Sequence, residues 1–142
     1  MSILLFFVIL IALVLVHELG HFLVAKRSGV RVDEFGVGFP PKLFGVRRGE
    51  TLYSVNALPF GGFVKIFGET PDQESLHGPD SARSFVRKPK LTQAAVLIAG
   101  VAMNLLFAWL LYSGAFLIGM PTAVDPAQRG DITDARVLVT QV

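Results

Sequence analysis

Two long apolar runs dominate the chain, one on each side of a more polar middle. Residues 3–16 carry no polar side chain, residues 22–25 continue the run, and Lys26 and Arg27 close it. A helix needs about twenty mostly apolar residues to cross a bilayer. The pattern therefore predicts a membrane-spanning helix over residues 1–26, with Gly29 as its stop signal.

The second, mostly apolar run covers residues 94–120 and ends at Pro121. It predicts a second membrane-spanning helix over residues 91–120, long enough to tilt. Gly100 and Asn104 lie four positions apart and hence on one face of this helix. Small and polar residues at this spacing are typical of helix–helix contacts, and we prefer that role for Asn104 to direct catalysis.

The segment between the two runs changes to an alternating pattern. Apolar residues alternate with glycines over residues 35–39, and residues 52–57 alternate similarly. Such patterns predict short strands, with a hairpin tip at residues 47–50 and another strand at residues 63–67. Six of the twelve Phe lie between residues 35 and 67. The sheet is therefore either a small soluble β-core or, as we prefer, a sheet that lies against or dips into the membrane.

The remaining segments are polar. Residues 69–82 predict a loop, and residues 136–142, after a polar stretch, resemble the start of a β-domain. The predicted fold class is an α-helical membrane protein with two transmembrane helices that flank a membrane-associated β-region. We divide the chain accordingly into four parts: a first helix at residues 1–26, a β-region and polar loop at 27–90, a second helix at 91–120, and the truncated start of a β-domain at 121–142.

The distribution of positive charge predicts the topology. Eleven of the thirteen Lys and Arg fall between Lys26 and Lys90. The positive-inside rule places this segment in the cytoplasm, with the N-terminus and residues 121–142 outside. The first run lacks a basic start and a small-residue cleavage site, so we expect it to remain attached. No nucleic-acid-binding module is visible in the sequence.

The chemistry of the chain is concentrated in the first predicted helix. His17, Glu18 and His21 form an HExxH motif, which puts two imidazoles on one helix face, where both can bind one Zn²⁺. Glu18 is placed to take a proton from the attacking water. The alternative is a transmembrane helix whose histidines bond to neighbouring helices, but this explains neither Glu18 nor the spacing.

A catalytic zinc normally has three protein ligands, and the motif supplies two. The chain has no cysteine, so the third ligand must be His, Asp or Glu. Asp33, Glu34 and Asp72 are conceivable local ligands, although nothing in their spacing favours them.

These features together resemble the site-2 protease family of intramembrane zinc metalloproteases, over essentially the whole chain. The likeness rests on HExxH in the first helix, FGVGF at residues 35–39, LPFGGFVK at 58–65, Ser84-Phe85, and AGVAMN at 99–104. The family usually carries Pro where Val101 stands, a departure that should change the helix locally and leave the metal site alone.

The resemblance makes His17 and His21 zinc ligands and Glu18 the general base. It implies that the third ligand is an Asp on a later transmembrane helix, which is missing from these 142 residues. It also implies PDZ-like domains outside the membrane, of which residues 136–142 would form the first strand. The chain would then be the N-terminal part of a larger protease.

The resemblance further implies where the protein lies and what it cleaves. Family members of this bacterial type lie in the inner membrane and cut single-pass membrane proteins, such as anti-sigma factors and remnant signal peptides. A helical substrate must unwind before cleavage, and strand addition to the β-region could hold it extended. We expect Phe60, Gly61, Gly62 and Asn104 to contact such a substrate.

Two other functions stay open at this point. A scaffold that binds transmembrane partners without cleaving them would explain the missing third ligand. A metal transporter could use His17 and His21, but a transport path needs ligands from several helices, and only one helix here carries them.

Overall fold

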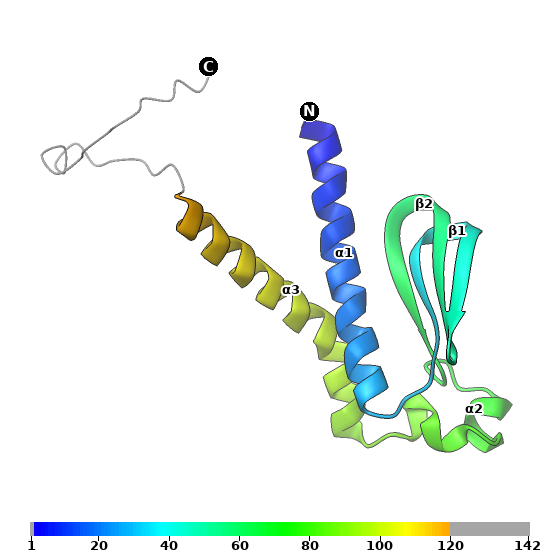
Figure 1. The fold of residues 1–142 in the computed structure, drawn as a ribbon. Helices are drawn as coiled ribbons and strands as arrows, with labels where there is room; N and C mark the ends of the chain where they lie inside the picture. Colours follow the sequence, from blue (N-terminus) through cyan, green and yellow to red (C-terminus); the bar gives the residue numbers. More distant parts are fainter. Residues whose placement is uncertain (1, 120–142) are drawn as a thin grey trace, which may run out of the picture. The chain divides into compact units, whose positions relative to one another are not determined.

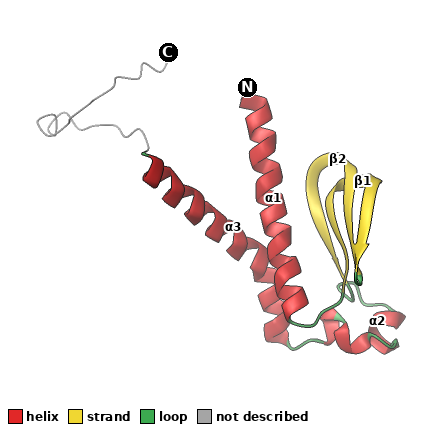
Figure 2. Ribbon diagram, viewed as in Figure 1, coloured by secondary structure: helices red, strands yellow, loops and turns green. Residues whose placement is uncertain are grey.

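The computed structural model describes residues 2–119. In chain order, two long helices flank an antiparallel sheet and a polar segment of short helical turns (Figures 1 and 2). The elements are α1 (Ser2–Arg27), β1 (Val32–Arg48), β2 (Thr51–Ile66), α2 (Gln73–His77), the 3-10 turns Ser81–Arg83 and Phe85–Arg87, and α3 (Lys90–Ile118). The predicted β-domain start at residues 121–142 lies outside the described residues. All contacts discussed below lie within the compact unit that ends at Leu110.

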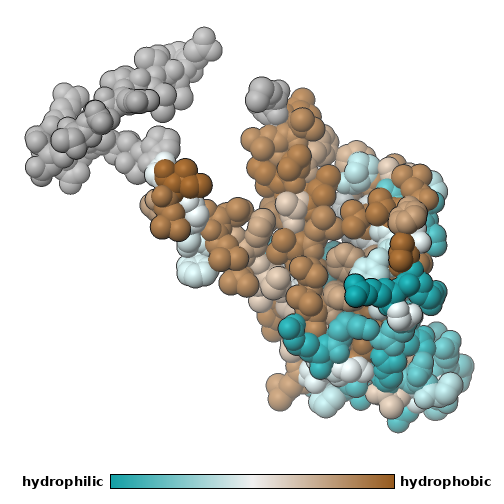
Figure 3. Space-filling view, viewed as in Figure 1, coloured by the Kyte–Doolittle hydropathy of each residue, from teal (hydrophilic) through white to brown (hydrophobic). Residues whose placement is uncertain are grey.

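Both long helices are candidate membrane spans. Ile3–Arg27 and Lys90–Ile118 have mean hydropathies of 2.7 and 2.3, and only 6% and 17% of their apolar windows are buried inside the protein. A core helix of a soluble domain would be mostly buried, so these surfaces call for an apolar environment. Figure 3 shows apolar residues covering α1, while hydrophilic residues gather around α2. Two membrane-spanning helices were predicted from the apolar runs, and both helices are present.

The end of α1 follows from its last residues. Lys26 and Arg27 lie in the last turn, where cations favour the helix dipole. Gly29 then adopts φ +68°, a left-handed conformation that glycine allows at low cost, and Val30 N–H donates to the Ala25 carbonyl. Ala25, Val30, Val32 and Val96 form a small buried cluster that joins α1, β1 and α3.

The sheet has two long strands that bend, instead of the separate short strands predicted. Gly36 pairs with both Phe63 and Ser54, so β1 lies between two segments of β2. The register places four segments side by side, in the order 42–48, 51–56, 32–39 and 62–66. Within residues 2–119, segment 62–66 therefore has one free edge, as segment 42–48 does on the opposite side. The predicted tip at residues 47–50 is confirmed, since Arg48 pairs with Thr51.

The polar segment after the sheet is more structured than the predicted loop. Asp72 caps α2: its side chain accepts from Ser75 N–H at 2.7 Å, and Ser75 Oγ accepts from Asp72 N–H at 2.9 Å. This reciprocal arrangement satisfies two backbone donors at the helix start. His77 ends α2.

A network of ion pairs attaches this segment to the helices and the sheet. Arg31 contacts Asp33 and Asp80, both at 2.8 Å, and stacks over Phe67 at 3.5 Å from the ring centre. Glu50 accepts from Lys26 at 2.5 Å and from Arg83 at 2.6 Å. We call this network the charged base; its members are Lys26, Arg31, Asp33, Glu50, Glu74, Asp80 and Arg83.

Candidate metal centre

The two histidines of the motif converge through their Nε2 atoms. His17 Nε2 lies 3.1 Å from His21 Nε2, because α1 is helical through both residues and residues four apart share a face. Two nitrogens that each lie 2.0–2.1 Å from a tetrahedral ion are about 3.3 Å apart. The two rings are therefore arranged as a pair of zinc ligands would be.

The position of α3 completes this arrangement. A Cβ on Gly100 would lie 2.4 Å from His21 Nε2 and 2.5 Å from His17 Nε2, so any larger residue would fill the space between the rings. Gly20 similarly allows contact with the Ala99 carbonyl, which a Cβ would approach to 2.4 Å. The predicted helix contact at Gly100 is therefore present. Small residues at this crossing therefore let α3 approach the imidazoles closely.

Each imidazole also contacts α3 through Nδ1. His21 Nδ1 lies 2.7 Å from the Val96 carbonyl, which can only accept, so Nδ1 carries the proton and Nε2 keeps its lone pair. Asn104 Nδ2 lies 3.4 Å from His17 Nδ1, and Asn104 Oδ1 is buried without a hydrogen-bond partner among the described residues. Metal-binding histidines usually have such outer partners, which set the tautomer and the ring orientation.

Glu18 lies between two cavities beside the histidines. A cavity of about 300 Å³ is lined by Glu18 and His21 together with residues of β2 and α3. A second cavity of about 220 Å³ is lined by Leu13, Val14, His17, Glu18 and Asn104. A water molecule or a peptide in either cavity could reach the Glu18 carboxylate, as a general base requires.

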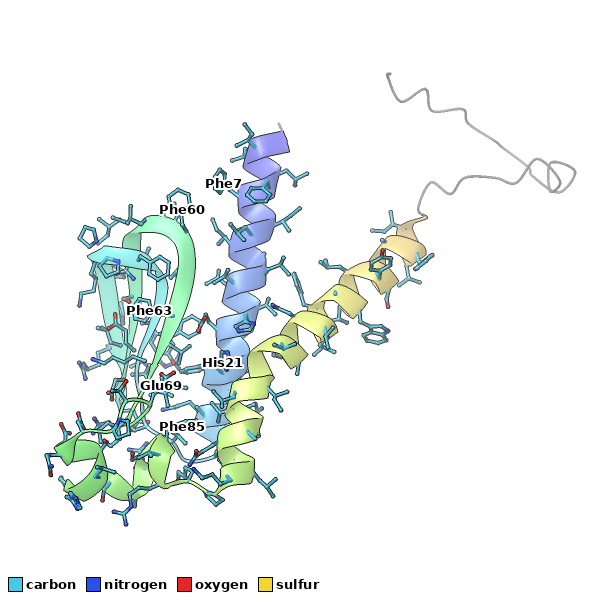
Figure 4. All side chains as sticks on the ribbon, turned by 180° about the vertical axis from the view of Figure 1, so that it is seen from behind. Phe7, His21, Phe60, Phe63, Glu69 and Phe85 are labelled. Atoms are coloured by element: carbon cyan, nitrogen blue, oxygen red, sulfur yellow. The ribbon has the colours of Figure 1, made fainter. Side chains whose placement is uncertain are left out.

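The larger cavity contains residues that the sequence analysis did not assign to the site. Phe63, Glu69 and Phe85 lie around the side of α1 that carries His21 (Figure 4). Glu69 lies three residues after the end of β2, and the turn there brings a second carboxylate to the cavity that Glu18 lines. A sequence pattern gives no sign of this, because the position depends on how the sheet packs against α1.

The residues predicted to contact substrate do not all lie together. A Cβ on Gly62 would be 3.5 Å from Glu18 Cγ, so Gly62 borders the site. Gly61 lies at the bend of β2, beside the Phe39 ring. Phe60 packs on Phe7 of α1, with ring centroids 5.6 Å apart (Figure 4). Phe7 precedes His17 by ten residues in α1. Ten helical residues span about 15 Å, so Phe60 is far from the histidines.

The three carboxylates considered as local third ligands have other partners. Asp33 bonds to Arg31, Glu34 accepts from Ser54 Oγ at 2.5 Å, and Asp72 caps α2. Residues 2–119 contain no group of three His, Cys, Asp or Glu that could hold a metal. Among the described residues, His17 and His21 fit zinc as two of its ligands.

Comparisons with known proteins agree with this site. Peptidase family M50 matches residues 5–140. The chain is 40% identical over 128 residues to zinc metalloprotease Rip1 of Mycobacterium tuberculosis, covering 89% of this chain and 31% of that protein. It is 50% identical over 103 residues to a Clostridium perfringens protein classed by name as a zinc metalloprotease, covering 72% of this chain and 29% of that protein. The chain thus spans about a third of the length of these relatives, and it belongs to peptidase family M50, the site-2 protease family.

Proposed function

We propose that the protein containing this chain is an intramembrane zinc endopeptidase that cleaves single-pass membrane proteins. The observation that carries the proposal is the convergence of the two Nε2 atoms, 3.1 Å apart, beside Gly100 and next to Glu18. His17 and His21 would hold zinc through these atoms. Bound zinc would lower the pKa of a coordinated water molecule and polarise the carbonyl of the scissile bond.

Glu18 would move the protons of the reaction. In its ionised form it accepts a proton from the attacking water, and it then donates that proton to the leaving amine. Its position at both cavities lets one carboxylate reach the water on one side and the peptide on the other. The third ligand would be an Asp on a transmembrane helix outside these residues.

The free edge of segment 62–66 would hold the substrate. Exposed strand edges bind extended peptides through main-chain hydrogen bonds. Phe63, Val64 and Ile66 line the same cavity as His21, so a strand added there would pass the candidate metal centre. Gly62 would allow close approach of its backbone, while Phe60 and Gly61 would contact the substrate farther from the metal.

The finer features of the whole protein are part of this proposal. We place it in the bacterial inner membrane with its N-terminus outside and residues 27–90 on the cytoplasmic side, as the charge distribution favours. Residues 121–142 would begin a PDZ-like domain outside the membrane. Anti-sigma factors and remnant signal peptides would be the substrates.

The test is Glu18→Gln in the full-length protein, purified in detergent with a single-pass model substrate. We expect zinc content and fold to be unchanged and cleavage to be lost, because glutamine cannot take the proton. His17→Ala is the control that should lose zinc as well. Cleavage that persists in Glu18→Gln would remove Glu18 from the mechanism.

The same experiment tests the alternative of a non-catalytic scaffold, which the two-ligand site among residues 2–119 favours. A full-length protein that binds transmembrane partners but neither binds zinc nor cleaves them would establish the scaffold in place of the protease.

A further inference from the structure

Asn104 faces the imidazole of His17 in an arrangement that metal binding cannot use. Its Nδ2 lies 3.4 Å from His17 Nδ1, while its Oδ1 is buried with no partner among residues 2–119. A neutral imidazole that gives the Nε2 lone pair to a metal carries its proton on Nδ1. Two donors would then face each other, and the amide oxygen would remain unpaired.

A half-turn of the Asn104 amide turns Oδ1 towards the Nδ1–H of His17 and moves Nδ2 to the buried position that Oδ1 leaves. The O and N atoms of an amide are nearly identical in shape, and their assignment follows from the hydrogen bonds around them. We propose that Asn104 is a positioning residue, whose Oδ1 accepts the Nδ1–H of His17 and thereby fixes the tautomer that leaves Nε2 free for the metal. This inference rests on the proposed zinc site.

The partner histidine already shows the same design. His21 Nδ1 donates to the Val96 carbonyl at 2.7 Å, so a residue of α3 accepts from it. Gly100 lies midway between Val96 and Asn104 along α3, one turn from each, and contacts both rings. Three successive turns of α3 would therefore serve the two histidines: Val96 orients His21, Gly100 allows close approach to both rings, and Asn104 orients His17.

The test compares zinc affinity in the full-length protein, by competition with a chromophoric chelator. Asn104→Leu keeps a similar volume and removes the acceptor, and Asn104→Asp keeps an acceptor. We expect the Leu variant to bind zinc about 10–100-fold more weakly, as removal of an outer-shell partner does, and the Asp variant to bind within a few-fold of the natural protein. Nitrogen NMR of the zinc form should show His17 protonated at Nδ1.

Two outcomes would overturn the inference. Either the Leu variant binds zinc as tightly as the natural protein, or both variants lose affinity equally, which would indicate packing alone. The variant His17→Ala distinguishes a failure of the Asn104 inference from a failure of the proposed zinc site. If that variant binds zinc like the natural protein, the metal assignment fails first, and the role of Asn104 falls with it.

Discussion

The crossing of α1 with α3 and the charged base are both polar sites in a mostly apolar chain. They differ in how completely their polar atoms are paired. At the base, Arg31 is bonded to Asp33 and Asp80, and Glu50 is bonded to Lys26 and Arg83. At the crossing, two imidazole nitrogens face each other and Asn104 Oδ1 has no partner among residues 2–119.

This difference is the one expected between a structural site and the proposed metal site. Buried polar groups are normally satisfied, and a group that is not has a cost that a ligand can remove. The charged base needs no further partner, because each of its carboxylates and cations has a partner of opposite charge. The crossing contains nitrogen lone pairs that converge beside Gly100, as the proposed metal site requires.

Gly100→Ala should break the crossing and leave the base intact, and it has the largest expected effect. The new Cβ would lie within 2.6 Å of both imidazoles, so the rings must turn away and lose their convergence. We expect zinc affinity to fall by more than about 100-fold, beyond the loss from removing an outer-shell partner, and proteolysis to disappear. Metal titration and a cleavage assay measure both.

Gly114→Ala is the matched control on the same helix. Apart from its chain neighbours and the backbone of its own helix, no described atom lies within 4 Å of its Cβ position, and alanine favours a helix over glycine. Zinc binding in this variant should be unchanged. Natural zinc affinity in Gly100→Ala would show that the histidines do not bind metal on the side that faces α3.

Glu50→Gln tests the base instead. Hydrogen bonds from Arg83 and then Lys26 hold the pKa of Glu50 at about 2, below its ordinary value of 4.5. A lowered pKa in the folded state means that the ionised carboxylate stabilises the fold above about pH 4.5. This contribution is lost as the pH falls through 4.5 towards 2.

We expect Glu50→Gln to lower the free energy of unfolding by about 1 kcal/mol at pH 7, because these partly exposed pairs are screened by solvent. Chemical unfolding in detergent at pH 7 and pH 3 should show a smaller difference between the two proteins at the lower pH. Glu74→Gln is the control, since its carboxylate is 62% exposed and 3.6 Å from Arg31. A difference that is equal at both pH values would show that the charge of Glu50 does not matter.

The sequence contained the features that depend on local spacing. The apolar runs were sufficient to predict α1 and α3, and the four-residue spacing predicted that His17 and His21 share a face. The tip at residues 47–50 followed from its turn residues. In each case, the information lies within a few residues of the feature.

Other features could not be found in this way, because they depend on distant residues. The double pairing of Gly36 with Phe63 and Ser54 requires both bends of the sheet, which alternation does not encode. Glu69 reaches the Glu18 cavity only because β2 packs beside α1. The contact of Gly100 with both imidazoles depends on the crossing point of two helices, although the small residue itself had indicated a helix contact.

The smallest expected effect tests the start of α2, in the polar segment that was predicted as a loop. The backbone N–H of Ser75 and then its side chain lower the pKa of Asp72, so the ionised cap stabilises α2 above its ordinary pKa of 3.8 and is lost below it. Asp72→Ala should speed hydrogen exchange at the Ser75 amide and leave the exchange of α1 unchanged, because the cap holds only the first turn of a short helix. Asp72→Asn keeps a side-chain acceptor and should restore most of the protection. If Asp72→Ala exchanges like the natural protein, α2 is held by Arg31 and its ion pairs instead, and the cap does not stabilise α2.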